Sequence, residues 1–363
     1  MNGIITLKEP LKLESGRWLS PVRVAYSMSG EPSETSNNVV IVCHTLTGGI
    51  NIYEQKEWWF VKPKQWIDSD QYCILSLEVL GGWRGSSSPK NHVSDAGRKT
   101  SSDFPTVTVT DSVRAHIKAL EHLNISRVRA IVGGSFGGFC VYTWLALAPR
   151  LINIAYIFQS APRCSAHTIG LFSLMRELIV NDPNWNAGKD EGREDSAPSK
   201  NISQAIALNR LFQFSHYFFE KKLPFKYRQD TVSLDAMYWE QFCNVDTFVN
   251  QPPKALAGLD TRCLLSILRS SSLFDLERSF PDLWERWNHL KTSIIHIPCR
   301  QDWRYPAEDM QTFHESCLQH KVHSVLKITD SPYGHGSFLH DPSSLDPLLA
   351  FLNSSLQAGR IEA

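Results

Sequence analysis

Hydrophobic and polar positions divide the chain into stretches of different character. Up to residue 162, short apolar runs alternate with helix-like stretches after an antiparallel opening, whose strands we expect at residues 11–14 and 22–26. The runs at 38–43 and 128–132 are almost wholly apolar, which is typical of strands buried on both faces of a parallel sheet. An apolar stretch of helical character, residues 139–148, follows the second run. This alternation predicts an α/β fold with a mostly parallel central sheet flanked by helices.

Strand signals fade in the middle of the chain and return near its end. The middle is expected to hold helices at residues 169–179, 202–220, 235–248 and 261–268, with a polar surface loop at 186–200. Two more strands are expected at residues 292–298 and 323–329, and a last helix follows them. We therefore expect a core made of residues 1–164 and 286–363, with residues 165–285 inserted as a helical lid.

A glycine-flanked serine stands at the end of the apolar run that finishes at residue 132. Gly133, Ser135 and Gly137 fit the pattern G-x-S-x-G, with a predicted strand before it and a predicted helix after it. A strained turn between such elements lifts one hydroxyl out of the backbone, and glycine tolerates the crowding on both sides. The bare pattern also occurs in glycine-rich turns whose serine is idle. In this context Ser135 is predicted to be a nucleophile roofed by the lid.

A serine nucleophile needs a base, and the two late strands lead to candidates. In this architecture an acid and then a histidine follow the serine, each on a loop after a late strand. Asp302 follows the first of the two strands, and His335 follows the second. We expect His335 to take the proton from Ser135, and Asp302 to orient and stabilise the imidazole. Asp330 is the alternative acid.

An oxyanion hole needs two backbone N–H groups. Phe136, the residue after the nucleophile, is expected to supply one of them. The other is expected from the loop after the strand at 38–43, where Leu46 is the first choice and Thr45 the alternative. His44, in the same loop, is interpreted as a structural histidine at a strand end.

Further short motifs occur along the chain, before and after the predicted nucleophile. They are His44–Gly48, Trp58–Trp59, Leu80–Gly82, Gly85–Ser86, Asp103–Pro105, Asp111–Arg114, Gly133–Gly138, Ala207–Arg210, Asp260, Asp302 and Ser331–His335. With them the chain resembles the homoserine and serine O-acetyltransferase family of α/β-hydrolase-fold enzymes, from about residue 7 to residue 352. Several ordered motifs are far more specific than G-x-S-x-G alone.

The resemblance implies a reaction in two half-steps. Acetyl-CoA acylates the serine, CoA leaves, and the hydroxyl of a small-molecule acceptor attacks the acyl-enzyme. An acyl-CoA is thus implied as co-substrate, with no bound cofactor. The family's triad falls on Ser135, Asp302 and His335, and its oxyanion donors fall on Leu46 and Phe136.

The resemblance also implies a substrate-binding pair. The family's arginine, which grips the carboxylate of the amino-acid substrate, corresponds to Arg210, and a tyrosine seven residues on corresponds to Tyr217. From the residues alone, Arg210 could equally belong to an ion pair of the lid. Relatives are often homodimers through the lid, so a homodimer is expected by analogy.

One departure from the family bears on the acceptor. Where the family reads Gly-His-Asp, and the aspartate pairs with the substrate's ammonium group, this chain reads Gly334–Gly336 as Gly-His-Gly. A buried ammonium without a partner is strongly disfavoured. Glu78, Trp83 and the stretches 61–66 and 261–263 also depart from the family pattern, on predicted active-site and tunnel loops. We therefore expect retained acyl chemistry with a secondary-metabolite alcohol, rather than homoserine or serine, as acceptor.

Composition argues against several other classes of protein. The 363 residues carry 37 Lys and Arg against 37 Asp and Glu, with 42% hydrophobic residues, so neither nucleic-acid binding nor disorder is indicated. Neither a signal peptide nor a membrane-spanning run is indicated, and we expect a cytoplasmic protein. The eight cysteines form no C-x-x-C pair, which favours free thiols. No cluster has zinc spacing, and no nucleotide-binding glycine motif occurs.

Two other functions stay open. If water replaced the acceptor, the chain would hydrolyse an ester, a thioester or a C–C bond, because the same triad performs either reaction. A protein that only binds small molecules would not need a triad, and failure of a covalent serine probe to label Ser135 would support that case.

Overall fold

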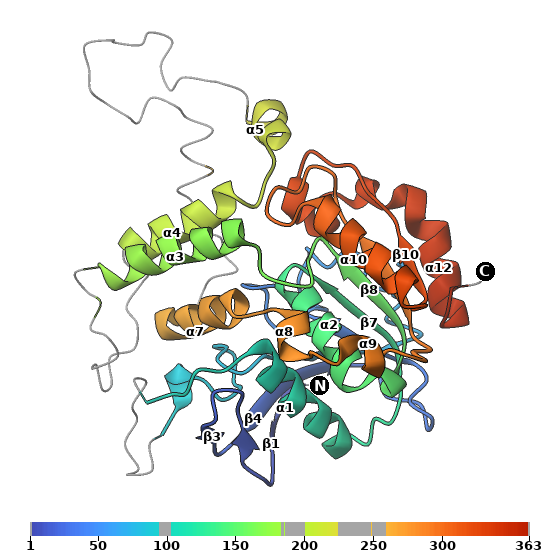
Figure 1. Cartoon of the computed structure of the whole chain (residues 1–363), viewed down its shortest axis with the longest axis horizontal. Coiled ribbons are helices and arrows are strands. Elements are labelled where there is room, and N and C mark those ends of the chain that lie inside the picture. The colour runs from blue at the N-terminus through green and yellow to red at the C-terminus, as the bar shows by residue number, and fades with distance from the viewer. Residues whose placement is uncertain are drawn as a thin grey trace.

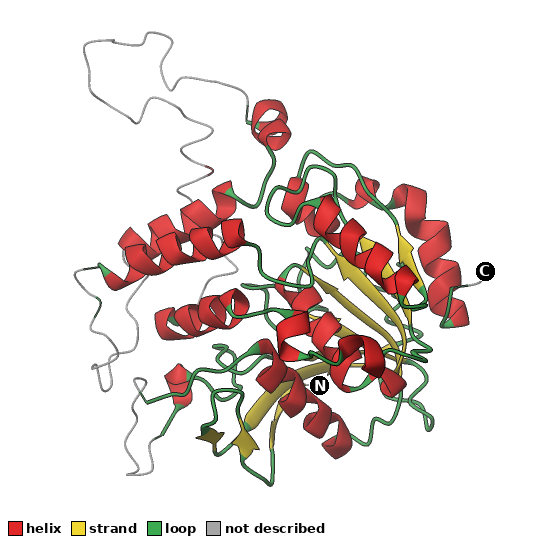
Figure 2. Cartoon of the chain, viewed as in Figure 1, coloured by secondary structure: helices red, strands yellow, loops and turns green. Residues whose placement is uncertain are grey.

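The computed structural model describes residues 2–93, 103–182, 185, 200–223, 248 and 259–361. These residues form a large sheet with helices on both faces and a separate short ribbon (Figure 1, Figure 2). The sheet strands, in spatial order, are β1 (Asn2–Thr6), β4 (Arg23–Ser29), β6 (Cys73–Leu77), β5 (Val39–Cys43), β7 (Val128–Gly134), β8 (Ile152–Phe158), β9 (Ser293–Ile297) and β10 (Ser324–Leu326).

Most of this sheet is parallel. The strands from β6 to β10 pair in parallel, while β1 and β4 pair antiparallel at one edge. The predicted α/β fold with a mostly parallel sheet is thus confirmed. The expected pairing of residues 11–14 with 22–26 is wrong: β2 (Leu11–Lys12) pairs with β3 (Trp18–Leu19) in the separate ribbon, and β1 is the strand that pairs with β4.

The buried strands point their side chains alternately into two hydrophobic layers, as the period of a strand requires. In β5, Ile41 enters one layer, whereas Val40 and Val42 enter the other. The first layer is covered by α1 (Val109–His122), α2 (Phe136–Leu147) and α10 (Ala307–Gln319), and the second by α12 (Leu349–Ala358) and an aromatic loop before β6. Strands buried on both faces explain why the apolar runs of the sequence do not alternate.

The strand order reverses beside β5, because the chain leaves β5 for β6 on one side and returns to β7 on the other. The ends of β5 and β7 lie in register, with Cys43 paired to Gly133. In open α/β sheets, ligands bind outside the carboxyl ends of the strands at such a reversal. The loop after β5 and the turn after β7 therefore meet where a site is expected.

The described residues between β8 and β9 are helical apart from their connections (Figure 1). Their helices are α3 (Ala166–Val180), α4 (Lys200–Leu211), α5 (His216–Lys222), α7 (Thr261–Ser272), α8 (Leu276–Ser279) and α9 (Leu283–Arg286), and α3 packs against α4 and α7. The predicted single helix at 202–220 is wrong. The chain turns after α4, and the Ser215 side chain begins α5 by accepting a hydrogen bond from the Phe218 amide.

Some expectations fall outside the described residues. These are the helix at 235–248 apart from Phe248, the loop at 186–200 apart from Lys200, and Cys243. The other seven cysteines are buried and unpaired. Within the described ranges, no helix is long and apolar enough to cross a bilayer. Short helices complete the chain: η1 (Pro89–Asn91), η2 (Pro149–Leu151), η4 (Gly334–Gly336), α11 (Ser337–His340), η5 (Pro342–Ser344) and η6 (Asp346–Leu348).

Candidate active site

Ser135 stands on a strained turn between β7 and α2. Its φ of 55° and ψ of −124° lie outside the regions that non-glycine residues usually adopt. The turn is closely packed, since a Cβ at Gly133 would lie 2.4 Å from the Gly137 carbonyl oxygen, and one at Gly137 would lie 2.3 Å from the Cys43 carbonyl oxygen. Glycine at both positions lets α2 begin directly against the end of β5.

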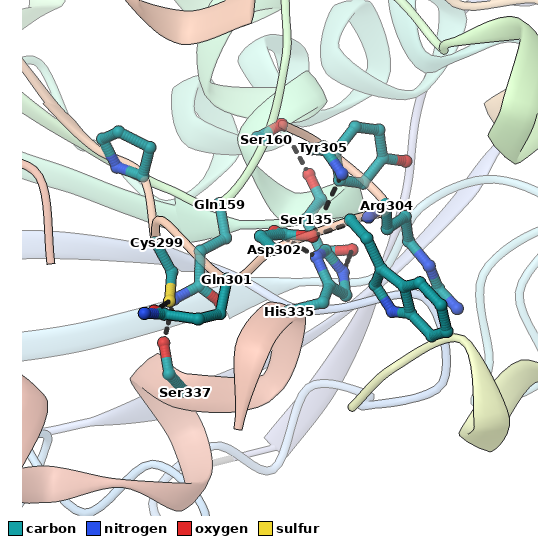
Figure 3. Close-up of polar contacts among 12 residues, drawn as sticks. Ser135, Gln159, Ser160, Cys299, Gln301, Asp302, Arg304, Tyr305, His335 and Ser337 are labelled. Atoms are coloured by element: carbon teal, nitrogen blue, oxygen red, sulfur yellow. Dashed lines mark hydrogen bonds and ion pairs between the residues drawn. The ribbon is translucent and has the colours of Figure 1, made fainter. Parts of the chain in front are cut away.

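The structure brings the three predicted triad residues together in a buried site (Figure 3). The Ser135 hydroxyl donates to His335 Nε2 at 2.8 Å, and His335 Nδ1 donates to Asp302 Oδ2 at 2.8 Å. The other carboxylate oxygen of Asp302 accepts the backbone amides of Arg304 at 2.9 Å and Tyr305 at 3.0 Å. These bonds orient the carboxylate and fix the tautomer in which Nε2 is free to accept a proton.

The alternative acid, Asp330, lies apart from this hydrogen-bond chain. Its carboxylate is exposed and accepts from Arg300 Nε at 3.1 Å and Gln301 Nε2 at 3.1 Å. The geometry therefore favours Asp302 over Asp330 as the partner of His335.

Burial sets the charge state of the base. Burial lowers the pKa of His335, the adjacent Asp302 raises it, and the Arg304 guanidinium lowers it further, with a net shift below the usual range. His335 is thus neutral at neutral pH, which is the form that can accept a proton from Ser135.

Arg304 is a residue of this site that the sequence did not indicate. It is buried, and its Nη2 donates to the Asn209 carbonyl oxygen at 3.0 Å and to the Asn209 side-chain oxygen at 3.0 Å. Its own carbonyl oxygen accepts from the Thr168 hydroxyl at 3.1 Å. Arg304 therefore connects the Asp302 loop to α3 and α4. The contact joins residues far apart in the chain, so no local pattern could reveal it.

The predicted oxyanion donors lie on adjoining segments. Phe136 is the first residue of α2, and Leu46 lies buried in a turn closed by the Gly48 amide donating to the Thr45 carbonyl oxygen at 3.1 Å. Because Gly137 has no side chain, its backbone packs directly against Cys43, and the two segments lie close together. The arrangement is compatible with two amides serving one oxyanion, and the roles of Leu46 and Phe136 stay predictions.

His44, next to this turn, makes backbone contacts with both ring nitrogens. Nδ1 lies 2.9 Å from the Thr45 carbonyl oxygen, and the Val79 amide lies 3.5 Å from Nε2. Burial lowers the pKa of His44 to about 4. A neutral histidine bonded on both sides has a structural role, which matches the interpretation from the sequence.

A cavity of about 400 Å³ adjoins these segments. Its lining includes Thr45 and Gly48 from the loop after β5, Arg210 and Gln213 from α4 and its exit, and His340 from α11. Burial lowers the pKa of the Arg210 guanidinium, which remains a cation because its ordinary pKa is far above neutral. The predicted substrate arginine is thus part of the cavity wall.

Tyr217 does not join Arg210 there. Its side chain is 62% exposed, and it is not among the described residues that line the cavity. The reason is the orientation of α5, whose buried position is Phe218, packed against Phe214. The structure does not bring the two members of the expected substrate-binding pair together.

Two departures from the family pattern now have a location. A Cβ at Gly336 would lie 2.9 Å from His340 and 3.2 Å from Gln213, both of which line the cavity, so an aspartate there would face it. Glu78 is instead buried beneath a loop, where it accepts the amides of Arg84 at 2.6 Å and Ser86 at 3.0 Å. Burial raises the pKa of Glu78 to about 7.

Several known proteins are similar to this chain in sequence and in fold. A family model for the alpha/beta hydrolase fold matches residues 38–342. Homoserine O-acetyltransferase of Haemophilus influenzae is 30% identical over 346 residues, which are 94% of this chain and 95% of that protein. The chain belongs to the homoserine O-acetyltransferase family of the α/β-hydrolase superfamily. The homoserine O-acetyltransferase of Methanosalsum zhilinae is 29% identical over 96% of this chain and 72% of its own length.

Solved structures of low identity extend the likeness of the fold. Homoserine O-acetyltransferase from Bacillus anthracis has a TM-score of 0.83 at 19% identity, covering 100% of this chain and 99% of its own. Esterase E22 has a TM-score of 0.81 at 19% identity, covering 98% and 99%. This homoserine O-acetyltransferase-like acyltransferase therefore has a fold that is also found in proteins named as esterases.

Proposed function

We propose that the chain is an acyl-CoA-dependent O-acyltransferase, with acetyl-CoA as the donor and a covalent acyl-Ser135 intermediate. Ser135 Oγ attacks the thioester carbonyl while His335 takes the hydroxyl proton. His335 then protonates the departing sulfur, and CoA leaves as a thiol. In the second half, His335 removes the proton of the acceptor hydroxyl, whose oxygen attacks the acyl group. The ester bond to Ser135 breaks, and His335 returns the proton to Ser135 Oγ. The amides of Leu46 and Phe136 stabilise the oxyanion in both halves.

The observation that carries this proposal is the unbroken hydrogen-bond chain from Ser135 through His335 to Asp302. Both bonds are 2.8 Å long, and all three side chains are buried. A buried nucleophile with an oriented base is the arrangement that covalent acyl transfer requires. Arg210 in the adjoining cavity supports an acceptor that carries an acid group.

We further propose that the natural acceptor is the alcohol of a secondary metabolite, rather than homoserine or serine. Gly336 faces the cavity without the carboxylate that the family resemblance leads us to expect there. An α-ammonium group held beside Gly336 would then lack a direct counter-charge at that position.

Hydrolysis on the same triad is the second candidate. The same missing carboxylate favours it, because a cavity that does not hold a specific alcohol leaves water as the competing nucleophile. The two reactions share the acyl-Ser135 intermediate and differ in what removes it.

Mass spectrometry of the intact protein after mixing with acetyl-CoA tests the proposal. We expect a gain of one acetyl group that is absent from a Ser135→Ala control and that water removes slowly. Candidate alcohols are then compared by how fast they remove the adduct. An adduct that clears quickly without any alcohol would establish the hydrolase. A protein that gains no acetyl group and releases no CoA would contradict the donor assignment.

Restoring the carboxylate tests the acceptor. We expect Gly336→Asp to lower the KM for homoserine roughly 10- to 100-fold, because a charged hydrogen bond to the ammonium group is gained. Its backbone, with φ of −91°, accepts a side chain, and the atoms it would crowd are the movable ends of His340 and Gln213. Homoserine-dependent release of CoA is the measurement. Gly336→Ala, which adds bulk without charge, is the control, and equal KM values for wild type and Gly336→Asp would refute the idea.

The charge of Arg304 gives a pH prediction. Removing this cation by Arg304→Met raises the pKa of His335, because the guanidinium lowers it. The acid limb of the pH profile of acylation, which follows deprotonation of His335, should therefore move to higher pH. CoA release in a single turnover from acetyl-CoA measures it.

Asn209→Ala is the matched control for that measurement. It removes one acceptor of the Arg304 guanidinium and leaves the charge in place, so the limb should stay where it is. A limb that stays fixed in Arg304→Met would show that the guanidinium does not act on His335.

A further inference from the structure

The cavity wall contains a second guanidinium that the proposed reaction does not use. Arg84, on the loop after β6, lines the cavity together with Arg210 from α4. Arg84 Nε is enclosed and has no hydrogen-bond partner among the described residues, and no ion pair in those residues includes it. The side chain as a whole is half-buried, so its terminal N–H donors can still take a ligand, and a buried donor without a partner is disfavoured unless a ligand supplies one.

The acid beside Arg84 is occupied elsewhere. Glu78 accepts the backbone amides of Arg84 at 2.6 Å and Ser86 at 3.0 Å, so its carboxylate anchors the loop. Burial raises the pKa of Glu78 to about 7, against the opposing effects of the two amides and of the Arg84 guanidinium. Glu78 therefore offsets the charge of Arg84 only in part. The other acids of the wall, Glu54 and Glu57, are exposed to solvent.

The chain also leaves room for this guanidinium. Gly49 has a φ of 99°, and a Cβ there would lie 2.1 Å from Arg84 Nε. Arg84 Cζ lies 5.8 Å from the centre of the Trp83 ring. The lining of the same cavity also carries the neutral polar residues Thr45, Thr47 and Asn51. Arg84 thus lies close to a glycine and an aromatic ring, at the wall of a cavity that carries polar residues.

We infer that Arg84 is an oxyanion-binding residue of this cavity, which holds a carboxylate or phosphate group of a substrate in addition to the acid group expected at Arg210. The planar guanidinium suits either group, because its N–H donors match two oxygens at once. The inference rests on the proposed function for the identity of the two substrates. The anion then comes either from the phosphates of the acyl-CoA donor or from a second acid group of the acceptor.

Equilibrium binding to the Ser135→Ala protein tests the inference without any acyl transfer. Calorimetry compares CoA with pantetheine, which lacks the phosphates, and malate with lactate, which lacks the second carboxylate. We expect Arg84→Gln, in the same background, to weaken binding of an anionic probe roughly 10- to 100-fold. A loss of affinity confined to CoA identifies the donor as the source of the anion, and a loss of affinity confined to malate identifies the acceptor.

Two further variants separate charge from fold. Arg84→Lys keeps the charge without the planar fork, so its affinity should lie between those of the parent and Arg84→Gln. Arg300→Gln, at an exposed arginine paired with Asp330, should bind every probe as the parent does. The inference would be overturned if the parent and Arg84→Gln bound all four probes with equal affinity. It would also be overturned if the parent bound neither CoA nor malate. Failure of acetyl-CoA to acylate Ser135 would instead overturn the proposed function and leave this binding result unchanged.

Discussion

Replacing Asp302 with asparagine is expected to slow acylation of Ser135 by about 10,000-fold without unfolding the protein. Asparagine has the shape of aspartate, and its oxygen can still accept the amides of Arg304 and Tyr305. Its NH₂ group would then face His335 Nδ1, which must become an acceptor. The proton moves to Nε2, the nitrogen that faces the Ser135 hydroxyl at 2.8 Å, and the base is lost. Single-turnover release of CoA from acetyl-CoA measures the rate.

Asp330→Asn is the matched control for this variant. Asp330 lies on the loop that leads to His335, but it is exposed and paired with Arg300 at 3.1 Å. Its replacement should leave the rate of acylation close to that of the wild type, because exposed ion pairs contribute little. A loss of similar size in Asp330→Asn, with wild-type rates in Asp302→Asn, would assign the acid to the other aspartate. Thermal melting of both variants shows whether either rate reflects misfolding.

The parts of the site that the sequence predicted well are those with a local pattern. The strand before Ser135, the turn and the helix after it lie within 20 consecutive positions, from Val128 to Leu147. The spacing of hydrophobic residues and of glycines determines such a segment almost by itself. Asp302 and His335 were found in the same way, since each follows a strand that the sequence makes apolar. What brings them together is the parallel order of β7, β8, β9 and β10, which follows from the alternation of strands and helices.

The parts that the sequence missed depend on packing between distant segments. The pairing of β1 with β4 could not be separated from a pairing with residues 11–14, because short half-exposed strands carry little pattern. Arg304 and Asn209 are 95 positions apart, and only the fold shows that they touch. Tyr217 is a case in which local pattern gave no guidance. Its pairing with Arg210 comes from the family resemblance and stays a prediction, but the chain turns between α4 and α5 and the Tyr217 side chain is exposed.

Gly137→Ala is expected to lower the free energy of unfolding by about 2–3 kcal/mol, because its added methyl group has no room. The new Cβ would lie 2.3 Å from the Cys43 carbonyl oxygen and 3.0 Å from that of His44. Both contacts are with backbone, which cannot rotate away as a side chain can. The start of α2 must therefore move from the end of β5, and Phe136 moves away from Leu46. We expect acylation of Ser135 to slow as well, since the two amides proposed to stabilise one oxyanion are separated.

Gly170→Ala provides a control of opposite sign in urea-induced unfolding. Gly170 lies on the exposed side of α3, and a Cβ there would have no atom within 4 Å. Alanine stabilises a helix interior relative to glycine by about 1 kcal/mol, so this variant should unfold at a higher urea concentration than the wild type. The same chemical change is thus expected to stabilise α3 and destabilise the junction of α2 with β5. If both variants unfolded together with the wild type, the close packing of the Ser135 turn against β5 would not contribute to stability as the geometry requires.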